Sequence, residues 1–329
     1  MSAYKFDAYE GYRTGDRFAS NLLRFLSNFK GQELDDALTM ATKIIFISAK
    51  EMHELSMEVY YKIKLKLLDI IINDKAAELE PWEYGKAYSK YYLDYLEKSL
   101  FVAMSDSSKI DYFRRHAQVD NESIISTYKI DVDALIQYGK KNEERNPHAD
   151  YENKKFIFLI DDFSGSGYTF LRQLQKFHDR WYDHIKYRNI FFCPYIITDS
   201  AFEKISRSYS EQIPPEDGVS FEILPTLKIP LNHTVTDQNC MIFGESKIHP
   251  KNILSLCDTY YHESIEDDHT RKNGGVKYGF GNSGLLVVKH DNSPNDSLFL
   301  IWFKDHKCNT ALRDWNPLFP RIPRHKNLK

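Results

Sequence analysis

The chain has 329 residues, of which 42% are apolar and 28% are charged, and its formal net charge at pH 7 is −3. These values are typical of folded globular proteins and exclude a disordered, collagen-like or disulfide-stapled chain. The near-zero charge also excludes a whole-molecule field that would draw the protein onto nucleic acid or an anionic membrane. The four cysteines are scattered, and the apolar runs are far shorter than the roughly 20 residues of a membrane-spanning helix. We therefore expect a cytoplasmic protein without a membrane partner.

The first part of the chain is expected to be helical. Apolar residues recur at helical spacing from residue 15 to about residue 95, and Lys62, Lys64 and Lys66 fall between them. Such a pattern is more typical of a solvated helix face over a core than of a DNA-contacting module. Residues 1–95 are therefore predicted to form a helical N-terminal region.

From about residue 98 the pattern changes to short apolar runs, small polar turns and helical stretches. This alternation predicts an α/β domain over residues 96–329, with a mostly parallel sheet flanked by helices. The expected strands are 100–104, 156–160, 190–197, 219–224, 285–289 and 298–303. The expected helices are 111–117, 169–182, 200–209 and 250–263. A charged segment that contains a proline, residues 139–153, is expected to be a loop or linker.

The most informative stretch begins with the apolar run 156–160, which leads directly into Asp161 and Asp162. Ligands of open α/β sheets bind at the carboxyl ends of the strands. The two carboxylates are therefore expected either to face solvent or to hold paired hydroxyls or Mg²⁺.

The loop that follows the two aspartates contains glycines and hydroxyl side chains and leads into a helix, as a phosphate cradle does. Its residues are Ser164, Gly165, Ser166, Gly167, Tyr168 and Thr169. It is not a Walker A loop, because no lysine follows the last glycine. A capped strand-to-helix turn would explain the loop alone, but not the loop together with the carboxylate pair.

The nine residues from Asp161 to Thr169 resemble the ribose 5-phosphate motif of type I phosphoribosyltransferases. The resemblance implies a phosphoribosyltransferase-like, Rossmann-like fold. It also implies that Asp161 and Asp162 are the catalytic residues that hold the ribose hydroxyls and could ligate Mg²⁺. The loop of residues 164–169 would then bind the 5-phosphate.

An upstream segment resembles the pyrophosphate loop of the same enzymes, because a strand, a small polar turn and a helix follow one another there. The residues concerned are Ser105, Asp106, Ser107, Ser108, Lys109, Arg114 and Arg115. The three basic side chains would place positive charge beside a diphosphate that Mg²⁺ bridges. The alternative is a serine-rich helix cap followed by a surface arginine pair.

The chain is most similar to a divergent branch of this superfamily that occurs in bacterial conflict and anti-phage gene clusters, including retrons. Residues 285–302 and 315–321 contribute to that similarity. It implies a defence effector that acts at the anomeric carbon of phosphoribosyl diphosphate or of a nucleotide, as a phosphoribosyltransferase or as an enzyme that cleaves N-glycosidic bonds. The implied partners are proteins of a defence complex, among them a reverse transcriptase with its nucleic acid.

Two alternatives to an enzyme remain. The chain lacks a recognisable base-binding hood, which favours a catalytically inactive nucleotide sensor or scaffold subunit. The basic tail from Arg313 and the helical N-terminal region could instead contact nucleic acid. Packing of that tail onto the protein's own core is an equally good interpretation, because the tail contains apolar residues such as Trp315 and Phe319.

Two further patterns are interpreted as structural. The segment 279–284 fits G-x-G-x-x-G by letter but precedes an expected strand, so we predict a glycine-rich turn and no dinucleotide site. The acidic residues between His262 and His269 are of metal-ligating types, but an acidic helix end explains them more simply.

Overall fold

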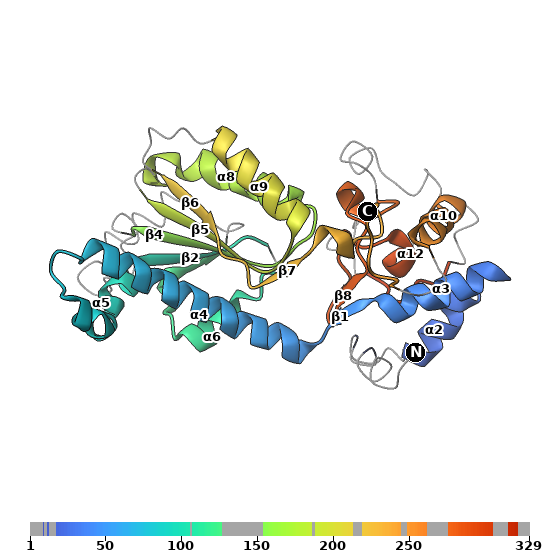
Figure 1. The fold of residues 1–329 in the computed structure, drawn as a ribbon, viewed down its shortest axis with the longest axis horizontal. Helices are drawn as coiled ribbons and strands as arrows, with labels where there is room; N and C mark the ends of the chain where they lie inside the picture. The colour runs from blue at the N-terminus through green and yellow to red at the C-terminus, as the bar shows by residue number, and fades with distance from the viewer. Residues whose placement is uncertain are drawn as a thin grey trace, which may run out of the picture. The chain divides into compact units, whose positions relative to one another are not determined.

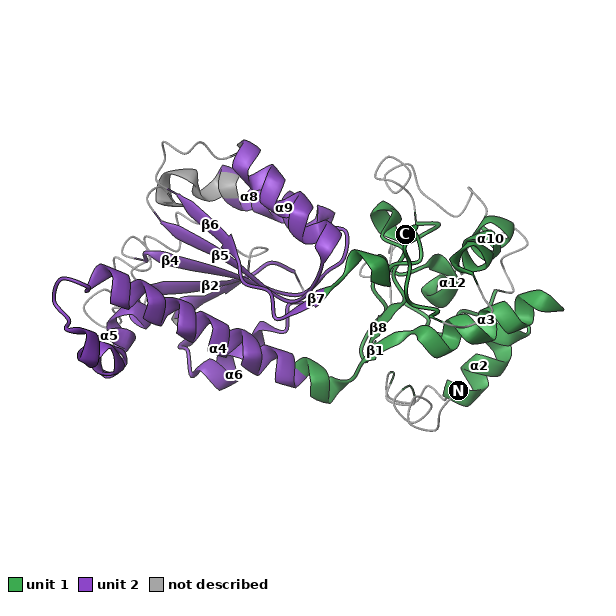
Figure 2. Cartoon of the chain, in the orientation of Figure 1, with its two compact units in different colours: residues 1–52, 229–329 green, residues 53–228 purple. Residues whose placement is uncertain are grey.

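A six-stranded β-sheet organises residues 53–228, which form unit 2 of the computed structural model (Figure 1; Figure 2). Unit 1 consists of residues 1–52 and 229–329. The structure describes residues 9, 12, 18–105, 107–126, 154–185, 188–212, 219–244, 249–261, 276–304 and 315–321.

The sheet of unit 2 is built from parallel pairs of neighbouring strands. Its order is β3-β2-β4-β5-β6, and β7 pairs with β5 outside this order. The strands are β2 (Ser99–Ala103), β3 (Ile124–Ser126), β4 (Phe156–Ser164), β5 (Asn189–Thr198), β6 (Ser220–Ile223) and β7 (Leu227–Ile229). The three central strands, β2, β4 and β5, are almost completely buried, as the long apolar runs of the sequence require for a sheet that is covered on both faces.

Helices cover both faces of this sheet. Figure 1 shows α8 (Tyr168–Ile185) and α9 (Asp199–Gln212) over one face, and α4 (Ala49–Asp74) and α6 (Ile110–Ala117) over the other. Side chains alternate between the faces. Leu159 and Phe192 pack with α8 and α9. On the opposite face the rings of Phe101, Phe158 and Phe191 form a stacked row, with centroid distances of 5.4 and 5.0 Å.

The remaining elements of unit 2 connect these layers. They are the 3₁₀ turns η1 (Pro81–Glu83) and η2 (Asn121–Ser123) and the helix α5 (Tyr84–Glu97). The apolar stripe predicted for α4 is buried, with Val59, Ile63 and Leu67 at most 1% exposed. Tyr60 of α4 and Phe101 of the sheet both contact Phe113 of α6, with ring centroids 6.5 and 5.0 Å apart.

Unit 1 joins the two ends of the chain in one aromatic core. Its elements are α2 (Phe18–Leu26), α3 (Gln32–Lys43), β1 (Ile45–Ile47), η5 (Leu231–His233), α10 (Pro250–Tyr260), η7 (Phe280–Asn282), β8 (Val287–Lys289) and α12 (Phe299–Trp302). β1 and β8 pair in parallel as a separate two-stranded sheet. Phe29 packs edge-to-face on Trp315 at 5.5 Å, and Phe18 stacks on Phe319 at 5.8 Å. The part of the basic tail that the structure describes, residues 315–321, therefore packs onto the core of unit 1.

The glycine-rich segment 279–284 forms a turn, as predicted. Gly279 has φ +82°, and a Cβ built on it would lie 1.9 Å from the carbonyl oxygen of Asp296. Gly284 has φ +59°, and its Cβ would lie 2.4 Å from Oγ1 of Thr236. Close backbone approach therefore requires glycine at both positions.

The predicted α/β architecture with its parallel sheet is confirmed, and the structure differs from the local predictions at three places. Residues 299–302 form a helix rather than a strand, because three consecutive buried apolar residues, 299–301, carry no period that separates the two. The expected strand at 285–289 pairs with β1 and lies outside the main sheet. β4 does not end at Ile160 but continues through both aspartates to Ser164.

The two compact units are defined by tertiary contacts, and their boundaries, at residues 52 and 228, differ from the expected boundary at residue 95. The N-terminal helices are shared between the units: α2 and α3 belong to unit 1, whereas α5 and nearly all of α4 belong to unit 2. The expected linker at 139–153 and the acidic segment between His262 and His269 lie outside the described residues. Within the described part of the chain, no helix has the length and apolar character needed to cross a bilayer.

Candidate ligand-binding site

The topology of unit 2 makes one edge of its sheet the candidate ligand site. β2 and β4 are neighbours, but β2 connects through α6 to β3 on one side, whereas β4 connects through α8 to β5 on the other. Such a reversal is a topological switch point, and ligands of open parallel sheets bind outside the carboxyl ends of the strands there. Both predicted motifs lie at these carboxyl ends.

Hydrogen bonds join the two motifs. Ser105 Oγ donates to Asp161 Oδ1 at 2.5 Å, and Ser107 Oγ donates to Asp162 Oδ1 at 3.1 Å. The backbone N–H of Asp162 donates to Asp161 Oδ1 at 3.1 Å. Only tertiary folding creates these contacts, because 56 residues separate Ser105 from Asp161.

The aspartates do not face solvent, since Asp161 is 3% and Asp162 is 1% exposed. A buried carboxylate is tolerated when donors compensate its charge, and serine hydroxyls and a backbone N–H serve here. A hydroxyl donor can be exchanged for a ligand hydroxyl of the same chemistry. The pair is therefore suited to hold a polyol.

Tyr195 of β5 lies beside the aspartates. The β4–β5 register places Asp161 opposite Pro194, the neighbour of Tyr195. The phenol of Tyr195 donates to the carbonyl oxygen of Lys109 at 3.1 Å. Burial, together with the negative charges of Asp162 and Asp161, raises the pKa of Tyr195 well above its usual value. The phenol therefore stays protonated and acts as a donor.

The polar turn after β2 is tightly closed. The N–H of Ser108 donates to the carbonyl oxygen of Ser105 at 3.1 Å. The N–H of Tyr112 donates to the carbonyl oxygen of Lys109 at 2.9 Å. Lys109 has φ 55° and ψ 29°, a left-handed conformation that costs a residue with a Cβ about 1–2 kcal/mol. Contacts such as the Tyr195 hydrogen bond hold it there. Asp106 lies outside the described residues.

The two arginines predicted for this motif lie further along α6. Arg114 and Arg115 occupy the last turn of α6. They are therefore about 6–8 Å further along the helix axis than its first residue, which follows the Lys109 turn. Arg114 Nε lies 3.9 Å from a carboxylate oxygen of Asp111, and Arg115 is exposed. The structure thus brings Ser105 and Ser107 to the aspartates and Lys109 to Tyr195, whereas a role of the arginine pair stays a prediction.

The second loop, residues 164–169, is held by α9 and by the end of β5. Thr198 Oγ1 donates to the carbonyl of Gly165 at 2.5 Å. Lys204 Nζ donates to the carbonyl of Ser166 at 2.8 Å and lies 3.8 Å from the ring centroid of Tyr168. Helix α8 begins at Tyr168, directly after the loop glycines. The loop is thereby presented at a helix N-terminus, where phosphate binding is favoured.

Gly167 has φ +76°, and a Cβ on it would meet Cα of Ala201 and Cγ1 of Ile205, both at 3.4 Å. The loop backbone thus packs directly onto α9. The hydroxyls of the loop are positioned differently, since Ser164 and Ser166 are 5% exposed whereas Thr169 is half-buried. Tyr168 is 42% exposed and forms the outer side of the loop.

Sequence reasoning missed Tyr195, Thr198 and Lys204. Thr198 ends an apolar strand and accepts from the N–H of Ala201 at 3.0 Å, so its position as a helix cap was readable from the sequence. Tyr195 and Lys204 carried no such signal. Their place at the site depends on β5 pairing with β4 and on α9 packing beside the loop.

The donor set suits Mg²⁺ only in part. Among the described residues, no group of three or more His, Cys, Asp or Glu side chains is placed to hold a metal ion. Mg²⁺ commonly binds through one or two carboxylates together with water and substrate phosphates. Asp161 and Asp162 fit that pattern, so a bound ligand would have to complete the coordination.

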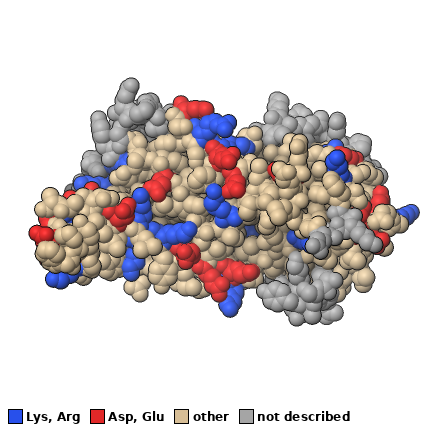
Figure 3. Space-filling view, viewed as in Figure 1, with Lys and Arg blue, Asp and Glu red and all other residues tan. Residues whose placement is uncertain are grey.

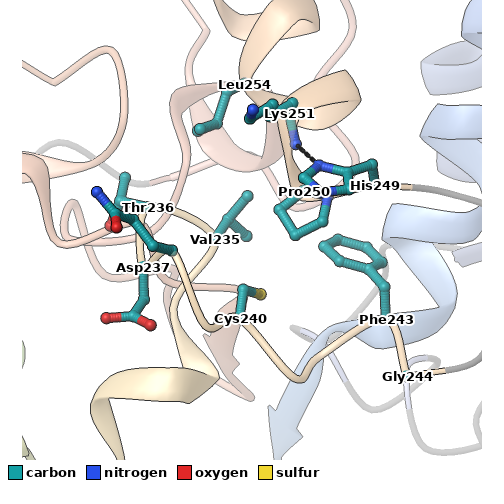
Figure 4. A pocket seen from close by; sticks show the side chains of 11 residues that line it. Val235, Thr236, Asp237, Cys240, Phe243, Gly244, His249, Pro250, Lys251 and Leu254 are labelled. Carbon is teal, nitrogen blue, oxygen red and sulfur yellow. Dashed lines mark hydrogen bonds between the residues drawn. The ribbon is translucent and has the colours of Figure 1, made fainter.

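A separate cavity of about 630 Å³ lies in unit 1, and no predicted site residue lines it (Figure 4). The sulfur of Cys240 points toward Phe243 and Pro250 (Figure 4). Burial is the main cause that raises the pKa of the Cys240 thiol, which therefore stays protonated and is a poor nucleophile. The lining of this cavity mixes polar residues such as Asp237 and Lys251 with apolar ones such as Phe243 and Leu254.

Comparison with known protein families gave a match. The family model described as PRTase-CE matches residues 22–321, a range that includes both predicted motifs. The search of curated proteins and the search of solved structures gave no match.

Proposed function

The chain belongs to the PRTase-CE family and is phosphoribosyltransferase-like, and from that premise we propose that unit 2 binds phosphoribosyl diphosphate or a nucleotide through its ribose 5-phosphate moiety. One observation carries the proposal. Ser105 and Ser107 meet Asp161 and Asp162 by hydrogen bonds at the switch point of the sheet. Two motifs of complementary ligand chemistry thus share one edge.

Each group has a role that follows from its chemistry. Asp161 and Asp162 accept hydrogen bonds from the ribose hydroxyls, which take the place of the serine donors. The loop 164–169 binds the 5-phosphate through its backbone N–H groups and hydroxyls. Lys109 supplies positive charge to the diphosphate. Mg²⁺, held by the aspartates and the ligand, would neutralise diphosphate oxygens.

The proposed reaction is substitution at the anomeric carbon. The bond from that carbon to the diphosphate, or to the base of a nucleotide, breaks as an acceptor attacks. The ring passes through an oxocarbenium-like state, as in glycoside cleavage. The residues of this chain contribute by orienting the sugar and by stabilising the departing anion. Asp161 and Asp162 are the catalytic residues of this proposal.

A sensor without turnover is the second candidate, and one observation favours it. Serine hydroxyls and a backbone N–H contact the aspartates, and groups of this kind position a ligand without exchanging protons near neutral pH. In either case we propose an anti-phage defence role, in which a protein partner such as a reverse transcriptase restrains the protein. The resemblance of residues 285–302 and 315–321 to proteins of retron-type clusters supports that role.

A calorimetric titration tests the proposal. Phosphoribosyl diphosphate with Mg²⁺ is titrated into the full chain and into the Asp161→Asn/Asp162→Asn variant. The control is Asp69→Asn, an exposed aspartate on α4 whose side chain is 62% exposed. We expect the double variant to lose at least about tenfold in affinity, because each lost charge-assisted hydrogen bond costs about 1.5–3 kcal/mol, and the control to bind normally.

Three outcomes separate the candidates. Failure of the unmodified protein to bind this ligand or any nucleoside 5-phosphate would refute both pocket functions. If the ligand binds, release of pyrophosphate or free base distinguishes an enzyme from a sensor. Salt-dependent binding of nucleic acid that survives loss of the aspartates would instead support the nucleic-acid alternative.

Acidic and basic side chains are interspersed on the face of unit 2 drawn in Figure 3.

A further inference from the structure

Two histidines from different helices meet on the α4 and α6 side of the unit 2 sheet. His53 lies four residues after the start of α4, and His116 lies in the last turn of α6. Nδ1 of His53 and Nε2 of His116 are 3.4 Å apart. The ring centroids are 4.4 Å apart, and the ring planes are inclined by 71°.

The distance between these nitrogens fits two ligands of one metal ion. Imidazole nitrogens bind Zn²⁺ at about 2.0–2.1 Å, and two such bonds at a tetrahedral angle place the nitrogens about 3.3–3.4 Å apart. An N–H hydrogen bond is usually shorter, at about 2.7–3.2 Å. We propose that His53 and His116 form a site for a borderline transition-metal ion, Zn²⁺ first, separate from the aspartate pair.

The protonation state and the position of His116 both favour metal binding. A metal ion requires the neutral imidazole, and burial, followed by the charge of His53, lowers the pKa of His116. His116 lies at the carboxyl end of α6, where the helix dipole favours positive charge. His53 lies just beyond the first turn of α4, where the opposite dipole has largely decayed.

Water would complete the coordination. His53 is exposed, so solvent reaches the pair. No third His, Cys, Asp or Glu joins it among the residues that the structure describes. Nitrogen ligands select Zn²⁺, Ni²⁺ or Cu²⁺ over Mg²⁺, which prefers oxygen. The ion would tie α6, which begins at the Lys109 turn, to α4, and so would stabilise the folded state.

Zinc titration of the full chain against a chromophoric chelator tests the site. The variants are His53→Ala, His116→Ala and the pair together, and the control is His233→Ala, an exposed histidine of unit 1. Because the chain has 12 histidines, the readout is the difference between proteins. We expect each single variant to lose one equivalent of bound Zn²⁺ and the double variant to lose no more, because one imidazole alone does not chelate.

Thermal unfolding with and without Zn²⁺ gives the second readout. Zn²⁺ should raise the midpoint of the unmodified protein and of His233→Ala more than that of either site variant. His53→Cys should restore binding, since a thiolate also ligates Zn²⁺, and this rescue separates lost ligation from misfolding. The proposal is overturned if either alanine variant binds as much Zn²⁺ as the unmodified protein, or if the two losses add. Neither result depends on ribose-phosphate binding.

Discussion

Removal of a single hydroxyl, in Tyr195→Phe, tests how the polar turn at Lys109 is held. The phenol donates to the carbonyl of Lys109 at 3.1 Å, and the ring, which is 0% exposed, stays in place in the variant. The carbonyl keeps its second donor, the N–H of Tyr112 at 2.9 Å, so no buried acceptor is orphaned. The expected loss in unfolding free energy is therefore that of one hydrogen bond, about 1 kcal/mol.

That energy is comparable to the cost of about 1–2 kcal/mol for the left-handed backbone of Lys109. The turn should therefore relax in a measurable fraction of molecules. A loss of about 1 kcal/mol corresponds to about fivefold in affinity. We expect this loss for phosphoribosyl diphosphate and not for ribose 5-phosphate, because Thr198 and Lys204 hold the other loop independently.

Calorimetric titration with both ligands and urea unfolding measure the two effects. The matched control is Tyr209→Phe, which removes a buried hydroxyl that has no hydrogen-bond partner within the described part of the chain. This control should be at least as stable as the unmodified protein, because it relieves an unsatisfied group. Equal losses of affinity for both ligands, or no loss for the diphosphate, would refute the reasoning.

Three further changes give distinct expectations. Gly167→Ala should lower the unfolding free energy by about 1–2 kcal/mol, because its φ is +76°, and urea unfolding measures this. Lys204→Ala should weaken ribose 5-phosphate binding in calorimetry. The control Lys228→Ala, which removes a lysine paired with an aspartate at 3.0 Å, should not weaken it. Equal weakening by both variants would contradict a local role of Lys204 at the loop. His116 has a pKa lowered from 6.5 by burial and by His53, so the unfolded chain binds its proton more readily. As the pH falls below 6.5 toward the pKa of His116 in the folded protein, the unmodified protein should therefore lose stability relative to His116→Gln. Identical pH profiles of the unfolding free energy for the two proteins would contradict this.

The chemistry of the candidate site was readable in the sequence because its order is local. The apolar run 156–160, the two aspartates, the hydroxyl- and glycine-rich loop and the helix follow one another along the chain. Each step depends on neighbouring residues, that is, on burial of a strand, on backbone freedom at glycine and on the capping of a helix. The parallel α/β class was predicted from the local alternation of apolar runs, polar turns and helical stretches.

Local sequence patterns do not show which elements become neighbours in the fold. The run 298–303 has the pattern of a strand, but residues 299–302 form helix α12, in which residues 299–301 are buried. Likewise, the strand at 287–289 pairs with β1 near the start of the chain. Pairing is decided by burial between distant segments, which a local period does not encode.

The sequence by itself determined the ligand-type residues and the strand–loop–helix units that carry them. Tertiary structure alone decided that β2 lies beside β4, and so that Ser105 and Ser107 reach the aspartates. It also brought Tyr195 to the turn and Lys204 to the loop. The physical reason is that these contacts join residues far apart in the chain, and only packing of the whole sheet with its helices compensates the entropy of bringing them together.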